Sequence, residues 1–138
     1  MTSTWVVVWC DTPAVIGLNW RDRLMDGLLR RFLKPGFRHV FCLKRLRKGG
    51  WIVINPHGLC IDVSETHGDA YIENLREQEK RGLCTMARVQ AHRPEHWQRR
   101  GLLCCSSVIA HILGLRCGLW ATPFELYSIL SNQPITRS

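Results

Sequence analysis

Residues 39–55 read HVFCLKRLRKGGWIVIN, and this stretch decides the fold of the chain. Both ends of the stretch are rich in β-branched and aromatic residues, while its middle is basic and closes with the doublet Gly49-Gly50. Apolar runs on either side of a glycine turn are typical of a β-hairpin. The stretch therefore predicts two antiparallel strands, over residues 39–46 and 51–55, joined at a tip that contains Lys48 and the two glycines.

Further strand patterns lie on both sides of this hairpin. Residues 5–10 form a β-branched and aromatic run that ends at Asp11-Thr12-Pro13, which predicts a buried strand. Downstream, a predicted turn at Pro56-His57-Gly58 leads into a strand over residues 59–63, and residues 83–90 are a further candidate strand. Since short connections join the strands in the middle of the chain, we expect an antiparallel meander there.

Apolar residues at helical spacing occur near both ends of the chain. Residues 14–33 show this spacing first. A second helix is predicted from about residue 103 to Gly114, and a last short helix begins with Thr122 as N-cap and Pro123 at its first position. The polar residues 69–82 are compatible with either a short exposed helix or an irregular excursion.

The length and composition fit a single globular domain. The chain has 138 residues and a mass of 16.0 kDa, with 46% hydrophobic and 22% charged residues. A chain of this length has room for one hydrophobic core of ordinary size. We therefore expect residues 1–138 to form one α+β domain, with a central antiparallel sheet and helices at both chain ends.

The sequence shows no segment that would take the chain into or across a membrane. No apolar run approaches the roughly 18 residues needed to span a bilayer, which excludes an integral membrane protein. The first apolar run, residues 5–9, lacks the basic residues and the cleavage site of a signal peptide, so we expect a cytoplasmic protein. The seven cysteines are odd in number and scattered among apolar neighbours, which favours free thiols in a reducing compartment.

The chain is strongly basic. It has 19 Lys and Arg residues against 11 Asp and Glu, a net charge of +8 and a pI near 9.5. This charge favours anionic partners such as nucleic acid, anionic polymers or lipid head groups. Many of the basic residues fall at the predicted hairpin tip, in polar connections or at a helix end, and no known nucleic-acid-binding motif accompanies them. A non-enzymatic basic binding or accessory module, with nucleic acid among its candidate ligands, is therefore one function open to this chain.

A second function class requires a cysteine nucleophile, an imidazole within reach and a polar group that orients the imidazole. Cys104 and Cys105 lie at the start of the predicted C-terminal helix, and Cys105 is in phase with its apolar face. His39 begins one strand of the predicted hairpin and Asn55 ends the other, so a Cys–His–Asn arrangement is feasible. His57 is the rival of Asn55 as the orienting group. The alternative interpretation is that these thiols only fill the core.

Other kinds of site have weaker support in the sequence. His92 and His96 have ligand-like spacing, but Pro94 lies between them and no Cys pair accompanies them. No C-x-x-C pair occurs among the cysteines, and the glycine doublet lacks the strand–turn–helix context of a phosphate loop. We therefore expect neither a metal nor a cofactor.

Several short segments occur in an informative order. Residues 37–41 (FRHVF) and 51–55 (WIVIN) precede residues 105–109 (CSSVI), and residues 122–126 (TPFEL) follow them. In this order the segments resemble the histidine strand, the next strand, the C-x-x-[LV]-[VI] nucleophile helix and the Thr-Pro-x-x-Leu segment of circularly permuted papain-like proteins, which are relatives of the NlpC-type cell-wall peptidases. The resemblance implies a permuted papain-like fold and the activity of a cysteine peptidase or amidase.

The resemblance also implies a role for each candidate residue. Cys105 as thiolate would attack an acyl carbon, His39 would carry the proton to the leaving group, and Asn55 would fix the imidazole tautomer. Cys104 stays open as the alternative nucleophile. The Cys105 backbone N–H and Gln98 are candidate donors to the oxyanion.

The implied reaction class is the hydrolysis or transfer of an acyl group. Peptide, isopeptide and acyl-ester substrates all fit this chemistry, and the basic surface would suit an anionic polymer or lipid. Cell-wall cleavage from inside a cell is less natural for a chain with no export signal. A phage product, located in the host cytoplasm or the virion, would instead reach the wall at lysis.

Overall fold

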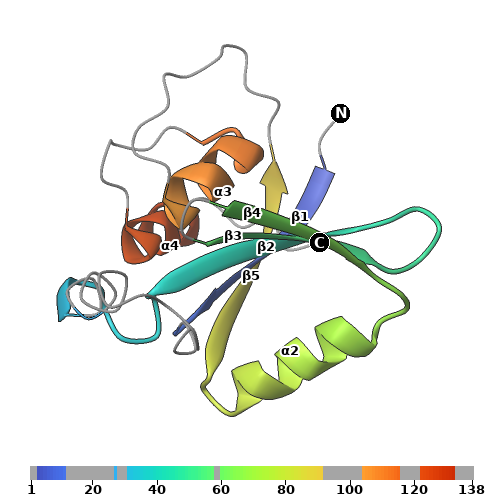
Figure 1. The fold of residues 1–138 in the computed structure, drawn as a ribbon, viewed down its shortest axis with the longest axis horizontal. Helices are drawn as coiled ribbons and strands as arrows, with labels where there is room; N and C mark the ends of the chain where they lie inside the picture. The colour runs from blue at the N-terminus through green and yellow to red at the C-terminus, as the bar shows by residue number, and fades with distance from the viewer. Residues whose placement is uncertain are drawn as a thin grey trace.

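The computed structural model of the chain describes residues 3–11, 27, 31–57, 60–91, 104–115 and 122–132. These ranges form an α+β structure with a central antiparallel sheet (Figure 1), which confirms this part of the predicted fold. The strands are β1 (Ser3–Cys10), β2 (His39–Arg45), β3 (Trp51–His57), β4 (Cys60–Thr66) and β5 (Cys84–Ala91). The helices are α2 (Ala70–Lys80), α3 (Cys105–Leu113) and α4 (Pro123–Ser131). Within this described part, no helix is long and apolar enough to cross a membrane.

The five strands form one antiparallel sheet with the order β4-β3-β2-β1-β5. The predicted meander is confirmed, because β2, β3 and β4 are neighbours both along the chain and in the sheet. The N-terminal strand β1 lies between β2 and β5, with Cys10 opposite His39 on one side and opposite Cys84 on the other. The first strand in sequence is thus an interior strand of the sheet.

Helices cover both faces of the sheet (Figure 1). Because side chains alternate along a strand, the apolar run of β1 contributes to two separate cores. The core under α3 and α4 comprises Trp5, Val7, Trp9, Val40, Cys42, Val89, Ala91, Ile109, Ala110, Leu113, Leu115, Leu126 and Leu130. The core under α2 comprises Val6, Val8, Phe41, Leu43, Trp51, Val53, Ile72, Leu75 and Cys84. Burial on both faces explains why residues 5–10 of β1 are apolar instead of alternating with polar residues.

Helix α3 ends, and helix α4 begins, at the residues that the sequence predicted. Gly114 ends α3 with φ of 71°, a left-handed conformation that glycine adopts without steric cost. At the start of α4, the Glu125 backbone N–H donates to Thr122 Oγ1 at 3.2 Å, and the Thr122 N–H donates to Glu125 Oε2 at 2.7 Å. Pro123 occupies the first helical position, so the predicted capping box is confirmed.

The structure differs from the predictions in the middle of the chain. Pro56 and His57 belong to β3 and not to a turn, so the connection to β4 falls on residues 58 and 59, outside the described residues. A proline is tolerated here because the ladder between β2 and β3 ends at the pair Cys42–Ile54, before Pro56 would have to donate to β2.

The helices are also not confined to the two chain ends. The segment predicted as an exposed helix or an excursion is the amphipathic helix α2, which lies between β4 and β5 in sequence and buries Ile72 and Leu75 against the sheet. The helix predicted over residues 14–33 lies almost entirely outside the described residues.

The hairpin between β2 and β3 supplies a stability prediction. Gly49 and Gly50 both have positive φ, of 87° and 83°. A Cβ at Gly50 would collide with the backbone carbonyl oxygen of Thr66, whereas a Cβ at Gly49 would meet no atom within 4 Å. We expect Gly49→Ala to cost about 1–2 kcal/mol from the left-handed conformation alone, and Gly50→Ala to cost clearly more because the collision is with backbone. Urea denaturation of both variants measures the difference, and equal losses would contradict the prediction.

Candidate active site

Two of the predicted site residues are in direct contact. His39 is the first residue of β2, Asn55 lies in β3, and His39 Nε2 is 2.6 Å from Asn55 Oδ1. The paired part of these two strands ends at Cys42–Ile54, so the hydrogen bond joins them just beyond the end of their ladder. The predicted hairpin thus places His39 and Asn55 at the same end of neighbouring strands.

The contact with Asn55 determines the tautomer of His39. An amide oxygen can only accept, so His39 Nε2 carries the hydrogen and Nδ1 keeps the lone pair of a base. The ring is 8% exposed and stacks on Phe41, with 6.2 Å between the ring centroids. Burial lowers the pKa of His39, and the hydrogen bond with Asn55 opposes this effect. At neutral pH the imidazole is therefore neutral and able to accept a proton at Nδ1.

The segment that leads into His39 is tied to the end of β1. The Asp11 carboxylate accepts a hydrogen bond from the Gly36 backbone N–H at 2.8 Å and lies 3.8 Å from the Nε of Arg38. Asp11 directly follows β1, whose last residue is opposite His39. These contacts fix the chain just before β2 and so hold the backbone from which the imidazole projects.

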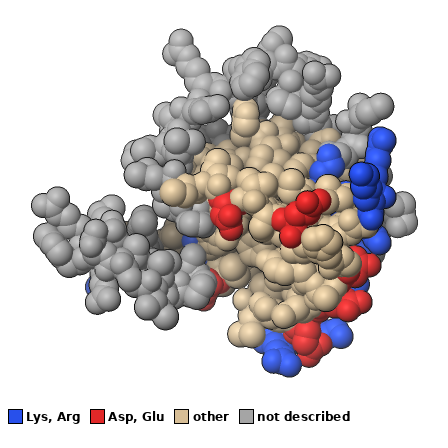
Figure 2. Space-filling model, turned by 45° about the vertical axis from the view of Figure 1, so that its right-hand side comes forward, with Lys and Arg blue, Asp and Glu red and all other residues tan. Residues whose placement is uncertain are grey.

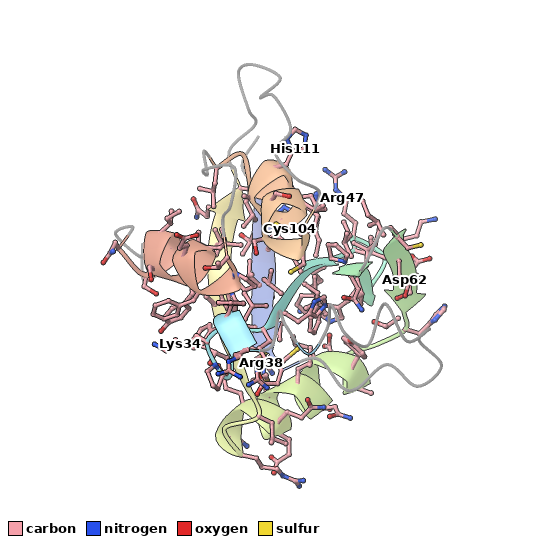
Figure 3. The ribbon with its side chains drawn as sticks, turned by 60° about the vertical axis from the view of Figure 1, so that its left-hand side comes forward. Lys34, Arg38, Arg47, Asp62, Cys104 and His111 are labelled. Carbon is pink, nitrogen blue, oxygen red and sulfur yellow. The ribbon has the colours of Figure 1, made fainter. Side chains whose placement is uncertain are left out.

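Cys105 is the first residue of α3, as the sequence predicted, and Cys104 is the N-cap. The Cys104 backbone N–H donates to Ser107 Oγ at 3.1 Å, and the Ser107 hydroxyl donates to the Cys104 carbonyl at 2.9 Å. Figure 3 shows Cys104 at one end of α3 and His111 at the other. The backbone that carries Cys105 is therefore well fixed at the start of the helix.

The surroundings of the Cys105 thiol act on its pKa in opposite directions. Burial raises the pKa of Cys105, whereas hydrogen bonds from the Val40 backbone N–H, the Ser106 hydroxyl and nearby amides lower it. The Ser106 Oγ is 3.9 Å from the Cys105 Sγ and is fully buried. Since burial dominates, the thiol is protonated at neutral pH in this structure. The position at the helix start alone does not make Cys105 a thiolate, although the resemblance implied a thiolate nucleophile.

The structure does not join Cys105 to His39. No hydrogen bond connects the two side chains, and neither group contributes to the pKa shift of the other. By strand alternation and by its stacking on Phe41, His39 lies on the sheet face covered by α2. The helix α3 packs on the opposite face, mainly against β2, with the thiol beside the Val40 amide. A thiol–imidazole contact would have to form around the end of β2, where His39 is the first residue.

A second thiol, which sequence reasoning did not consider, lies beside His39. Cys10 is directly opposite His39 in the β1–β2 ladder and opposite Cys84 in the β1–β5 ladder. Burial, followed by the charges of Cys84, Asp11 and Cys105, raises the pKa of Cys10 to about 11. Only the pairing register places Cys10 next to the imidazole, and no local motif around Cys10 could have indicated this.

Several predicted candidates fall outside the described residues. These are Gln98, His92 and His96, together with the side chain of His57, whose backbone belongs to β3. Of the two candidate orienting residues, only Asn55 has a side chain that the structure describes, and it contacts His39. Among the described residues, no group of three or more His, Cys, Asp or Glu side chains is arranged to hold a metal ion.

The basic residues of the hairpin tip are on the surface. Arg45, Arg47 and Lys48 are exposed, and Figure 2 shows Lys and Arg side chains gathered along one edge of the molecule. Arg45 lies 3.4 Å from the Asp69 carboxylate, so part of the positive charge is neutralised within the protein. A surface of this kind can attract anionic partners through long-range electrostatics.

The burial of His39 leads to a prediction about pH. A histidine with a lowered pKa binds fewer protons in the folded chain than in the unfolded chain, so stability falls as pH decreases below about 6.5. We expect His39→Gln to remove part of this loss, and His67→Gln, a substitution of an exposed histidine, is the control. Urea denaturation at pH 8 and pH 5 measures the effect. The same pH dependence in both variants would be evidence against it.

Comparison with known proteins identified no relative of this chain. No protein family, no curated protein and no solved structure matches this chain.

Proposed function

We propose that the chain is a thiol-dependent acyl hydrolase or transferase of the peptidase and amidase class, on a permuted papain-like fold. Cys105 is the nucleophile, His39 the general base and acid, and Asn55 the residue that orients the imidazole. The observation that carries the proposal is the 2.6 Å contact from His39 Nε2 to Asn55 Oδ1, which leaves Nδ1 free as a base. The start of α3 on β2, with the Cys105 thiol beside the Val40 amide, supports the choice of nucleophile.

The reaction proceeds in two acyl-transfer steps. The Cys105 thiol gives its proton to His39 Nδ1, and the sulfur attacks the acyl carbon of the substrate to form a tetrahedral oxyanion. The bond to the leaving amine or alcohol breaks, and this group takes the proton from His39. Water or an acceptor alcohol or amine then attacks the thioester, with His39 again taking and returning one proton, and the thiol is restored.

Features of α3 and of the two reacting groups support this sequence of steps. The backbone N–H of Cys105 is one of the first N–H groups of α3, which have no partner inside the helix, so it is available to the oxyanion. Because the resting thiol is protonated and the resting imidazole neutral, the proton transfer has to accompany attack on the substrate. A movement that brings the Cys105 thiol to His39 around the end of β2 is required, and catalytic contacts often tighten only when substrate is bound.

Alkylation of the thiols tests the proposal without a known substrate. We expect limiting iodoacetamide at about pH 6.5, roughly two units below the pKa of about 8.5 for a free thiol, to label Cys105 first. Cys60 is the internal reference because its side chain is exposed. Cys105 should react on the order of tenfold faster than Cys60, since His39 can accept the thiol proton as the sulfur attacks the alkylating reagent. Peptide mapping by mass spectrometry gives both rates.

Two histidine variants complete the experiment. His39→Gln should abolish the advantage of Cys105, and His67→Gln should retain it. Faster labelling of Cys60 than of Cys105 in the unmodified protein would contradict the proposed nucleophile. Preferential labelling of Cys10 would assign the activated thiol to the residue opposite His39 in the β1–β2 ladder.

The second candidate function is a non-enzymatic basic binding module, with nucleic acid among its ligands. It is favoured by the burial that raises the pKa of Cys105, as expected for a thiol that only packs, and by the exposed hairpin residues Arg45, Arg47 and Lys48. Binding of this kind should weaken steeply with salt and be indifferent to alkylation of Cys105. Slow and uniform labelling of all thiols would favour this candidate.

A further inference from the structure

A cavity of about 360 Å³ lies between α2 and the sheet, on the face opposite α3 and α4; we call it the α2 cavity. Val6, Trp51 and Met86 contribute its apolar floor from three strands, and Ile72 contributes from the helix. The Trp51 indole N–H donates to Asp69 Oδ1 at 2.9 Å, which fixes the ring. The volume is at the lower end of the range of small-molecule sites. The floor is preformed, because Val6, Trp51 and Ile72 belong to the core under α2.

The rim of the α2 cavity carries an excess of positive charge. Arg76 and Lys80 on α2 and Arg88 on β5 line it together with one acid, Glu79. Glu79 Oε1 accepts a hydrogen bond of 2.8 Å from the β5 backbone, and Lys80 is 3.6 Å from the Glu77 carboxylate. Within the described part of the chain, Arg76 and Arg88 take part in no ion pair and no hydrogen bond. Two unpaired guanidinium groups thus flank an apolar floor.

We propose that the α2 cavity binds a small amphipathic anion, namely a carboxylate or sulfonate on an apolar body. The planar guanidinium groups of Arg76 and Arg88 match the two oxygens of such a head group, and Trp51 and Ile72 contact the body. A bare inorganic anion would leave the apolar floor unused, and a neutral apolar molecule would leave the arginines unpaired. The site is on the other face of the sheet from α3 and does not rest on the proposed function.

Fluorescence titration with 8-anilinonaphthalene-1-sulfonate, followed by displacement with decanoate, tests the proposal. We expect saturable enhancement at one site and energy transfer from tryptophan. Arg76→Gln and Arg88→Gln should each weaken binding about fivefold to tenfold, which is about 1–1.4 kcal/mol. Arg47→Gln is the matched control, because Arg47 is an exposed arginine that does not line the α2 cavity. Thermal unfolding should be alike in the three variants, since all three arginines are exposed.

Each outcome decides the proposal. Displacement of the dye by decanoate supports the proposal if dye binding is weaker in Arg76→Gln and Arg88→Gln and unchanged in Arg47→Gln. Equal weakening in all three variants would show a general effect of surface charge and overturn the proposal. Displacement by inorganic phosphate as effectively as by decanoate would also overturn it, since the apolar floor would then play no part. Alkylation of Cys105 should leave binding unchanged, which separates this result from that of the proposed function.

Discussion

Replacing Cys105 with serine is expected to lower the turnover of an activated ester, such as p-nitrophenyl acetate, by roughly 10³-fold or more. A serine hydroxyl in the same place is a far weaker nucleophile than a thiolate, and loss of a nucleophile typically removes most of the catalytic effect of such a site. Stopped-flow or steady-state absorbance at neutral pH measures the rate. The substitution nearly keeps the size of the side chain, so the packing at the start of α3 is retained.

The adjacent thiol provides the matched control for this experiment. Cys104→Ser makes the same chemical change one residue earlier, at the N-cap, and should retain most of the rate. Loss of ester hydrolysis in Cys104→Ser and not in Cys105→Ser would make Cys104 the nucleophile. Loss in Cys10→Ser alone would identify the thiol that faces His39 as the nucleophile. An unchanged rate in all three variants would remove the basis of the proposed function.

Replacing Trp9 with alanine is expected to lower the free energy of unfolding by about 3–5 kcal/mol. Trp9 is fully buried in the core under α3 and α4, and its ring meets Tyr127 edge to face with 5.3 Å between centroids. The substitution loses the buried area, the aromatic pair and the contact between β1 and α4. A loss of this size is comparable with the whole stability of many small domains. Urea denaturation monitored by circular dichroism measures it.

An exposed apolar residue of the same sheet serves as the control. Val63 on the edge strand β4 is 56% exposed, so Val63→Ala should change the free energy of unfolding by no more than about 0.5 kcal/mol. A loss below about 1 kcal/mol in Trp9→Ala would mean that the core under α3 and α4 is not closed as described. It would also mean that α3 is not held on β2 as described, since the same packing holds it there.

The parts of the fold that depend on neighbouring residues were predicted well from sequence. The strand over residues 39–46 is observed as β2 (His39–Arg45), and the helix predicted to end at Gly114 does so. Thr122 and Glu125 form the predicted capping box. Turn glycines, helix caps and apolar periodicity act within a few residues, so their signals are present in the local sequence. The prediction of a turn at residues 56–58 was wrong. The β2–β3 ladder ends before Pro56, so the proline can remain in strand β3.

The candidate site was predicted only in part for a related reason. His39 and Asn55 meet because a hairpin brings the two ends of its strands together, and a hairpin is a local structure. Cys105 reaches the sheet through contacts that are distant in sequence, and no periodicity indicates which face of the sheet its helix covers relative to His39. Cys10 was missed because its place beside His39 depends on the pairing of β1 with β2.

The sequence by itself determined the local elements, the α+β class and the positive charge, and its hairpin made a meeting of His39 with Asn55 or His57 feasible. Only the tertiary structure decided that β1 lies inside the sheet, that α2 and α3 cover opposite faces, and that the Cys105 thiol is partly buried and protonated. The physical reason is that strand order, the face a helix covers and the burial of a thiol are set by packing between distant segments. The α2 cavity arises in the same way, from three strands and a helix that meet only in the folded chain.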